Sequence, residues 1–343
     1  MAKCFSFTAL QDSCYRYSFS RAGLKSFATD LGDGTVMHCW VPKTHVGSKP
    51  TLLLIHGFGA NAMWQFNHFI PQLKSTFNVY VPDLLFFGDS HTTRPERTEA
   101  FQAQCVMALM DALNVTNVDL MGMSYGGFVA YSIAAQFKER VGRVVLGCAG
   151  VCLGKKDTEK GLFQLSVDDA INILMPQNPD KVRELVRLSF HKPPPTGPNC
   201  FLNDFIEVMC TEYRQEKIEL IQALHDDKKQ SNLPKITQVF SSFYSSMVQL
   251  ILFLFSRSPS VVLFHMQPTL IIWGEYDQIF PVEMAHTLKS HIGESAELVI
   301  IKNMGHALKP KEMFKHMKSF LIDTPPPTKQ GNCINAHKML NFN

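Results

Sequence analysis

Short, almost wholly apolar runs alternate with helix-length stretches along most of this 343-residue chain. Such runs are typical of parallel strands, because both faces of the strand are covered and few polar positions are needed. Their alternation with helices predicts an α/β fold with a doubly wound, mostly parallel sheet, in which ligands bind at the carboxyl ends of the strands. The predicted strands are 51–55, 77–81, 118–121, 144–146, 270–273 and 298–301, after an edge strand at 35–41.

The helical patterns divide the chain into parts. The spacing of apolar residues is clearest for helices at 99–113 and 126–137. Between 151 and 238 only helical patterns occur, which predicts a helical cap inserted between two strands and lying over the site. The expected organisation is an N-terminal segment 1–29, a core of 30–150 and 268–322, the cap 151–238, an anomalous insert 239–267 and a loose tail 323–343.

Composition limits the function classes. Apolar residues make up 45% of the chain and charged residues 18%, as in globular proteins. The formal net charge is only +3, and Lys and Arg are spread along the chain, so we expect no nucleic-acid partner. The protein could also bind a membrane surface peripherally, and this alternative stays open. The sequence does not indicate the oligomeric state.

Nine cysteines occur at irregular intervals without a CxxC pair. This odd number and spacing argue against a disulfide framework and a zinc site. We therefore expect reduced thiols in a cytoplasmic protein without a metal or another cofactor. The basic, serine-containing stretch 1–27 leaves two alternatives open, an organelle-targeting signal or an amphipathic helix.

The segment 239–267 interrupts the pattern around it. Its apolar run 248–255 is too short to span a bilayer, which takes about 20 residues. The residues before it would join smoothly to Pro268 if it were removed. It begins with Val, whose codons start with GT, and ends with Gln, one of whose codons ends in AG, so we expect a retained intron or a gene-model error.

The strongest motif lies directly between a predicted strand and a predicted helix. It matches the G-x-S-x-G nucleophile elbow and makes Ser124 the expected nucleophile. A sharp strand-to-helix turn needs small neighbours, which the glycines two residues before and after the serine supply. The helix that follows also directs its N–H groups toward negative charge near the serine. The motif reads Gly122-Met123-Ser124-Tyr125-Gly126.

A serine hydroxyl needs a base, and the base needs an acid that holds its tautomer. His306 follows the last predicted strand, and Asp277 follows the strand before it, so both reach the sheet edge of Ser124. The order Ser, Asp, His fits this type of site. Glu275 is the competing acid, but its place early in the turn favours a loop role. Three other histidines are unsuitable because they lie in the insert or before the last strand: His265, His286 and His291.

An oxyanion requires preorganised donors. The sequence His56-Gly57-Phe58-Gly59 closes the strand 51–55, and we expect the backbone N–H groups of Phe58 and Tyr125 to be the donors. Asp83 and Asp89 lie in another loop at this edge, where we expect structural hydrogen bonds rather than catalysis.

The ordered motifs HGFG, VPDLLFFGDS, GMSYGGF, IIWGEYDQIFP and NMGHA resemble the α/β-hydrolase superfamily. The chain is similar to plant single-domain hydrolases that resemble monoacylglycerol lipases and bacterial C–C bond hydrolases. The resemblance covers about 30–322 and implies a triad of Ser124, Asp277 and His306, with Phe58 and Tyr125 at the oxyanion hole. Two departures are the insert and a short run after His306, which put the packing behind Asp277 and His306 in question.

We therefore expect a serine hydrolase that acts on a small acyl or ester substrate, such as a monoacylglycerol. An epoxide hydrolase would need Asp in place of Ser124. Two alternatives stay open, a C–C bond hydrolase that uses the same residues and a non-catalytic ligand-binding relative.

Overall fold

The computed structural model describes residues 6–59, 61–151, 161–226, 236–239 and 264–323. Within these residues, nine strands form one sheet in the order β1-β2-β4-β3-β6-β7-β10-β11, with β5 paired to β2. Neighbours from β4 to β11 in this order are parallel, whereas β1, β2 and β5 pair antiparallel. The predicted α/β class is confirmed. The strands are β1 Leu24–Gly32, β2 Thr35–Pro42, β3 Thr51–Ile55, β4 Asn78–Pro82, β5 His91–Thr92, β6 Val118–Met123, β7 Val141–Gly147, β10 Thr269–Gly274 and β11 Ala296–Ile301.

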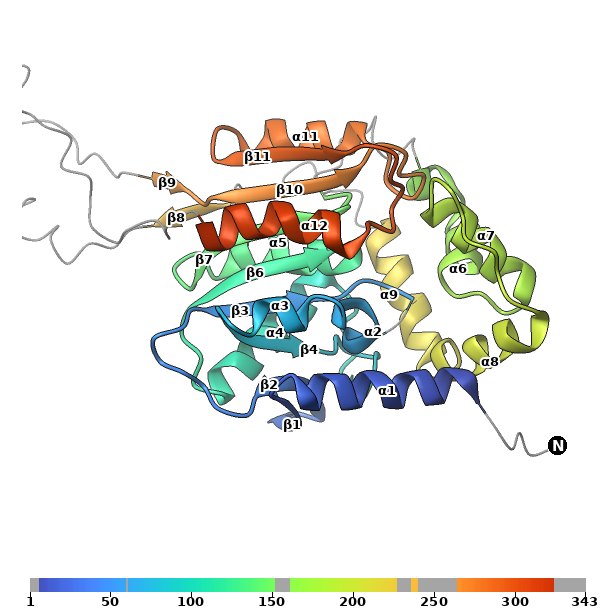
Figure 1. The fold of residues 1–343 in the computed structure, drawn as a ribbon, viewed down its shortest axis with the longest axis horizontal. Helices are drawn as coiled ribbons and strands as arrows, with labels where there is room; N and C mark the ends of the chain where they lie inside the picture. Colours follow the sequence, from blue (N-terminus) through green and yellow to red (C-terminus); the bar gives the residue numbers. More distant parts are fainter. Residues whose placement is uncertain (1–5, 60, 152–160, 227–235, 240–263, 324–343) are drawn as a thin grey trace, which may run out of the picture.

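The central strands are buried, and most of their residues are apolar on both faces. Every residue of β3, β4, β6 and β10 is buried. Each fully buried Leu or Ile side chain stabilises the fold by roughly 1.5–3 kcal/mol. Helices cover both faces of the sheet, with α3 and α12 on the near side in Figure 1 and α4 and α5 behind. The helices outside the cap are α1 Phe7–Arg21, α2 Ala62–Phe66, α3 Ile70–Leu73, α4 Glu99–Ala112, α5 Tyr125–Gln136, α11 Glu283–Ile292 and α12 Pro310–Lys318.

The N-terminal part belongs to the body of the molecule. Helix α1 buries Phe19 and packs beside β1 and α2, and its first turn meets the cap helix α8. The expected start of the core at residue 30 falls within β1, so the sheet begins earlier than the sequence indicated. The prediction that 35–41 forms the sheet edge is wrong, because β1 pairs with β2 along its outer side.

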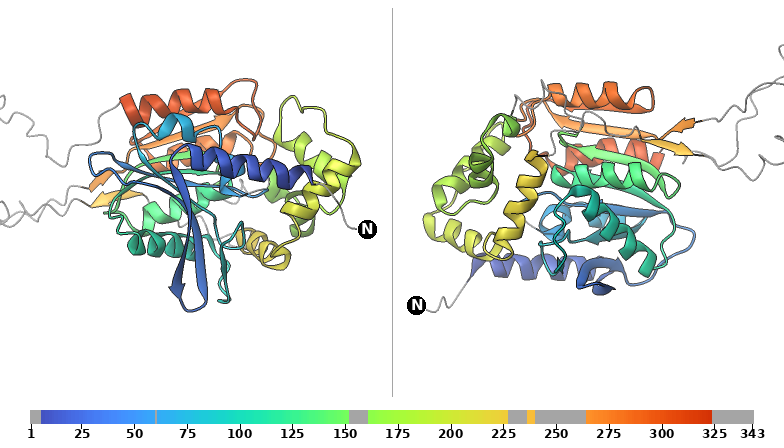
Figure 2. Two further views of the ribbon diagram at one scale, coloured as in Figure 1. Left: turned by 60° about the horizontal axis from the view of Figure 1, so that its bottom comes forward. Right: turned by 180° about the vertical axis from the view of Figure 1, so that it is seen from behind.

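The cap lies at the end of the sheet where the parallel strands finish, on the right in Figure 1. Figure 2 shows the same arrangement from two other sides, with the cap helices grouped at one end of the sheet. Its elements are η1 Gly161–Gln164, α6 Val167–Leu174, α7 Pro179–Ser189, α8 Asn199–Met209 and α9 Arg214–Asp226.

The described residues that flank the insert lie at the opposite end of the sheet. Strands β8 Thr237–Val239 and β9 Phe264–Met266 pair antiparallel, on the left in Figure 1. Residues 240–263 lie outside the described part of the chain, so their origin stays a prediction. Next to β9, the buried side chain of Gln267 donates a hydrogen bond of 2.6 Å to the carbonyl oxygen of Val141. Since β10 begins at Thr269 and Asp277 follows its far end, the paired strands β8 and β9 lie at the end of β10 away from Asp277.

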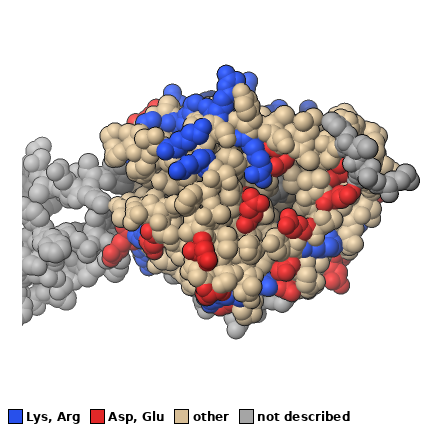
Figure 3. Space-filling view, turned by 90° about the horizontal axis from the view of Figure 1, so that it is seen from below, with Lys and Arg blue, Asp and Glu red and all other residues tan. Residues whose placement is uncertain are grey.

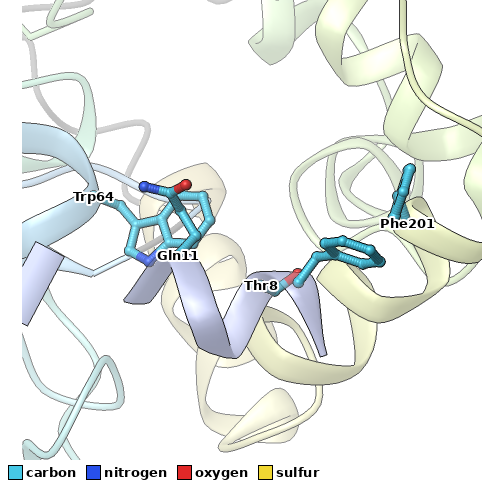
Figure 4. Close-up of a pocket in the computed structure, with 5 residues that line it drawn as sticks. Thr8, Gln11, Trp64 and Phe201 are labelled. Carbon is cyan, nitrogen blue, oxygen red and sulfur yellow. The ribbon is translucent and has the colours of Figure 1, made fainter. Parts of the chain in front are cut away.

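The surface carries a pocket and, on the face seen in Figure 3, a patch of charged residues. A pocket of about 300 Å³ between α1 and α8 is lined by Phe7, Thr8, Gln11, Trp64 and Phe201 (Figure 4), and contains none of the residues expected in the site. The face seen in Figure 3 carries both signs of charge, with Lys and Arg gathered toward its upper edge. Among the described residues, no helix is both long and apolar enough to cross a bilayer.

Candidate active site

Ser124 lies in the sharp turn between β6 and α5. Its backbone has φ 53° and ψ −123°, which costs about 1–3 kcal/mol for a residue with a side chain. The flanking glycines allow this turn. A Cβ on Gly122 would lie 2.3 Å from the carbonyl oxygen of Gly126, and one on Gly126 would lie 2.3 Å from that of Ile55. The structure thus shows why the motif needs glycine two residues before and two residues after Ser124.

Three side chains from three strand ends form one hydrogen-bonded chain. The Nε2 atom of His306 lies 2.9 Å from Oγ of Ser124, and its Nδ1 atom lies 2.8 Å from Oδ2 of Asp277. The carboxylate of Asp277 accepts the Nδ1 proton, which leaves the Nε2 lone pair for the serine hydroxyl. His306 can therefore receive the proton of Ser124 in this arrangement.

Asp277 is held in place by its own loop. Its side chain is fully buried, and Oδ1 accepts hydrogen bonds of 2.9 Å from the N–H groups of Ile279 and Phe280. The competing acid Glu275 instead accepts a bond from the N–H of Asn303 and ties the two loops together. The structure therefore brings Asp277, and not Glu275, to His306.

The loop after β3 packs directly against the nucleophile. A Cβ on Gly57 would lie 2.9 Å from Cβ of Ser124, so the backbone at Gly57, next to Phe58, packs closely against the serine. His56 fixes this loop: its Nε2 accepts from the N–H of Leu84, so its Nδ1–H donates to the carbonyl oxygen of Gly57 at 2.8 Å. Burial lowers the pKa of His56, which keeps the ring neutral. Sequence reasoning gave His56 no such role.

Phe58 and Tyr125 also meet through their side chains. Their rings form an edge-to-face contact at 4.8 Å, and Phe87 packs on Phe58 at 5.1 Å. On the other side of the site, Phe280 lies 5.5 Å from the ring of His306 and stacks on Phe163 of η1. The reacting groups are thus bordered by aromatic side chains.

Asp83 and Asp89 differ in burial and in the residues that they contact. Asp83 is buried and accepts from the N–H of Ala62 and from Nδ1 of His38, at 2.8 and 2.7 Å. His38 Nε2 in turn lies 2.8 Å from Oγ of Ser26. Asp83, His38 and Ser26 are thus hydrogen-bonded in the same sequence, acid to histidine to serine, as a catalytic triad. Ser26, however, is an exposed residue inside strand β1 and not at a strand-to-helix turn. Asp89 is exposed and lies 3.9 Å from Arg16.

The cap is in contact with the loops that carry His306 and Asp277. The carbonyl oxygen of Ser189, at the end of α7, accepts from the N–H of Ala307, and His191 stacks on Tyr276 at 4.0 Å. A Cβ on Gly305 would lie 2.7 Å from that same Ser189 oxygen. The run after His306 leads into α12, and His306 stays within hydrogen-bond distance of Asp277 and Ser124.

Cys148 is a neighbour of the site that sequence reasoning missed. It follows β7 with φ 45° and is 1% exposed, and its Sγ lies within 4.8 Å of a carboxylate oxygen of Asp277. Burial, together with the negative charge of Asp277, raises the pKa of this thiol well above its usual range. No spacing signal could have revealed this, because Cys148 and Asp277 meet only through the pairing of β7 with β10.

Comparisons with known proteins agree with the fold. A family model described as the alpha/beta hydrolase fold matches residues 50–166. An uncharacterized protein of Mycobacterium tuberculosis is 39% identical over 105 residues, 30% of this chain, and this match spans only 30% of that relative's length. Monoacylglycerol lipase abhd6-A of Xenopus laevis is 25% identical over 84% of this chain and 80% of its own length.

Among solved structures, a candidate lipase of Acinetobacter baumannii superposes with a TM-score of 0.71 at 22% identity, over 94% of this chain and 98% of its own. This likeness shows that the parallel sheet and its flanking helices form the α/β-hydrolase fold. The chain thus has the fold of the α/β hydrolases and is similar to lipase- and esterase-like members of that superfamily.

Proposed function

We propose that this protein is a serine hydrolase that cleaves a carboxylic ester through an acyl-enzyme on Ser124. The observation that carries the proposal is the continuous hydrogen-bonded chain from Asp277 through His306 to the strained Ser124, with distances of 2.8 and 2.9 Å. Ester hydrolysis is consistent with the lipase- and esterase-like homologues.

The reaction follows from the donors and acceptors. Oγ of Ser124 attacks the ester carbonyl while Nε2 of His306 takes its proton, and Asp277 stabilises the resulting imidazolium. The N–H groups of Phe58 and Tyr125 stabilise the oxyanion, aided by the N-terminus of α5. His306 then gives the proton to the departing alcohol, and water repeats the sequence on the acyl-enzyme to release the acid.

The substrate class is an ester with an apolar acyl chain, of the size of a monoacylglycerol or a small ester. The aromatic rings of Phe58, Phe87 and Phe280 around the reacting groups suit such a chain. The name of the Xenopus relative, a monoacylglycerol lipase, points in the same direction.

A fluorophosphonate probe and a panel of p-nitrophenyl esters of increasing chain length test the proposal. We expect rapid labelling and turnover in the wild type and loss of both in Ser124→Ala. Ser26→Ala is the matched control, since Ser26 also bonds a histidine that bonds an aspartate, and it should keep both. Labelling that persists in Ser124→Ala would refute the assignment. Folded wild type that neither labels nor turns over would indicate a ligand-binding protein, and cleavage of β-diketones but not esters would indicate a C–C hydrolase.

A further inference from the structure

The three groups beside the nucleophile are of the kinds that zinc prefers. Sγ of Cys148, a carboxylate oxygen of Asp277 and a ring nitrogen of His306 all lie within 4.8 Å of one another. Thiolate, carboxylate and imidazole are the usual zinc ligands in proteins. They come from the ends of β7, β10 and β11, which the sheet holds in neighbouring positions.

We propose that Cys148, Asp277 and His306 form an inhibitory binding site for a thiophilic divalent cation such as Zn²⁺. The cation would lie between Nδ1 of His306 and the Asp277 carboxylate, with the sulfur of Cys148 as the third ligand and solvent as the fourth.

The charges of the site match this ion. A Cys148 thiolate and the Asp277 carboxylate together carry two negative charges, which a divalent cation neutralises. Neutrality matters here because Cys148 and Asp277 are only 1% and 5% exposed, and an unbalanced charge in such surroundings is costly. The side chain of His306 is 15% exposed and that of Asp277 is fully buried, so the proposed ion would enter past the His306 ring.

The geometry requires only small changes. Ligand atoms around a tetrahedral zinc ion are roughly 3.3–3.8 Å apart, given bond lengths of about 2.0–2.3 Å. Nδ1 of His306 and Oδ2 of Asp277, now 2.8 Å apart, would separate slightly, and the sulfur would move inward from at most 4.8 Å. Rotation about side-chain bonds supplies shifts of this size.

Binding has a definite chemical balance. The ion replaces the thiol proton of Cys148, which leaves to solvent, and occupies the Nδ1 lone pair of His306. The imidazole proton is then carried on Nε2, so His306 can no longer accept the proton of Ser124. Inhibition of hydrolysis therefore rests on the proposed function, whereas binding of the ion does not.

The test uses the full chain carrying Ser124→Ala, which keeps the three ligands and removes turnover. We expect one Co²⁺ per chain with a thiolate-to-cobalt charge-transfer band, and displacement of Co²⁺ by Zn²⁺. Adding Cys148→Ala should remove the band and weaken Zn²⁺ binding at least about tenfold. Cys105→Ala, which removes another buried thiol, should change neither. If Cys148→Ala fails to fold, Cys148→Ser replaces it, since a serine hydroxyl gives no thiolate band.

A second arm measures ester hydrolysis with and without Zn²⁺, as a ratio within each variant. The wild type and Cys105→Ala should be inhibited, and the ratio for Cys148→Ala should move toward one. A cobalt band that is absent, or that persists without Cys148, would overturn the site. A band in a protein that hydrolyses no ester would leave the site intact and reject the proposed function instead.

Discussion

Gly57 and Ser124 approach so closely that a Cβ on Gly57 would lie 2.9 Å from Cβ of the serine and 3.0 Å from the carbonyl oxygen of Met123. Because both neighbours belong to the elbow, the added methyl group can be accommodated only by movement of the loop. The position of the Phe58 amide thus depends on the absence of a side chain at residue 57.

We therefore predict that Gly57→Ala lowers kcat by about 10²–10³-fold, the usual effect of losing one oxyanion donor. Gly47→Ala is the control, because a Cβ there meets nothing within 4 Å. Steady-state kinetics on a p-nitrophenyl ester measure the effect, and circular dichroism verifies folding. Unchanged kcat in a folded Gly57→Ala protein would contradict the oxyanion role of this loop.

Asp277 and Glu275 offer a matched pair of acids in one loop. Asp277→Asn cannot hold the Nδ1–H tautomer of His306, so we predict a loss of about 10⁴-fold in kcat. Glu275→Gln keeps an oxygen that accepts the N–H of Asn303 and should retain activity within a few-fold. If Glu275→Gln were the more damaging of the two, the assignment of the acid would be wrong.

Lys217 is a buried cation in the cap helix α9. It is 5% exposed, its Nζ lies 5.2 Å from the ring centre of Phe87, and it donates a long 3.4 Å bond to the carbonyl of Met209. Burial lowers the pKa of this amine below 10.5, the ordinary value. At pH values between the lowered pKa and 10.5, Lys217 is protonated more fully in the unfolded chain than in the folded protein. The contribution of Lys217 to the free energy of unfolding therefore rises with pH in this range.

We predict that Lys217→Met stabilises the protein by about 1 kcal/mol at pH 7, because it removes a charge that the fold desolvates. The advantage over the wild type should shrink as pH rises toward 10.5, since the wild-type amine then loses its proton. Urea unfolding of both proteins at several pH values measures this difference. Lys311→Met, at an exposed position of α12, should show no such trend.

Removal of the insert tests whether the core folds when Gln238 is joined directly to Pro268, next to the start of β10. Deleting 239–267 places Gln238 directly before Pro268, the position that Gln267 now occupies. A glutamine there can again donate to the carbonyl of Val141, so we predict a folded protein that labels with fluorophosphonate as the full chain does. In the deleted protein, Gln238→Ala should cost about 0.5–1.5 kcal/mol of stability, because it removes the hydrogen bond from this glutamine to the Val141 carbonyl. Loss of labelling on deletion would show that the insert supports the site.

Local sequence determined the fold class and the candidate residues of the site. The apolar runs identified the parallel strands, since burial on both faces favours a mostly apolar composition. The glycines around Ser124 predicted the elbow, because the sharp turn requires small residues on either side of the serine and this requirement is visible within five residues of sequence. His306 and Asp277 followed from their places after the last two strands.

Only the tertiary structure decided what these residues contact. Strand β1 went unpredicted because, of its residues, only Leu24 is buried, and an exposed strand carries no apolar pattern. The roles of His56 and Cys148 depend on neighbours far along the chain: Leu84 for the histidine and, through the pairing of Gly147 with Ile272, Asp277 for the cysteine. Strand order sets such contacts, and periodicity along the sequence carries no information about which strands become neighbours.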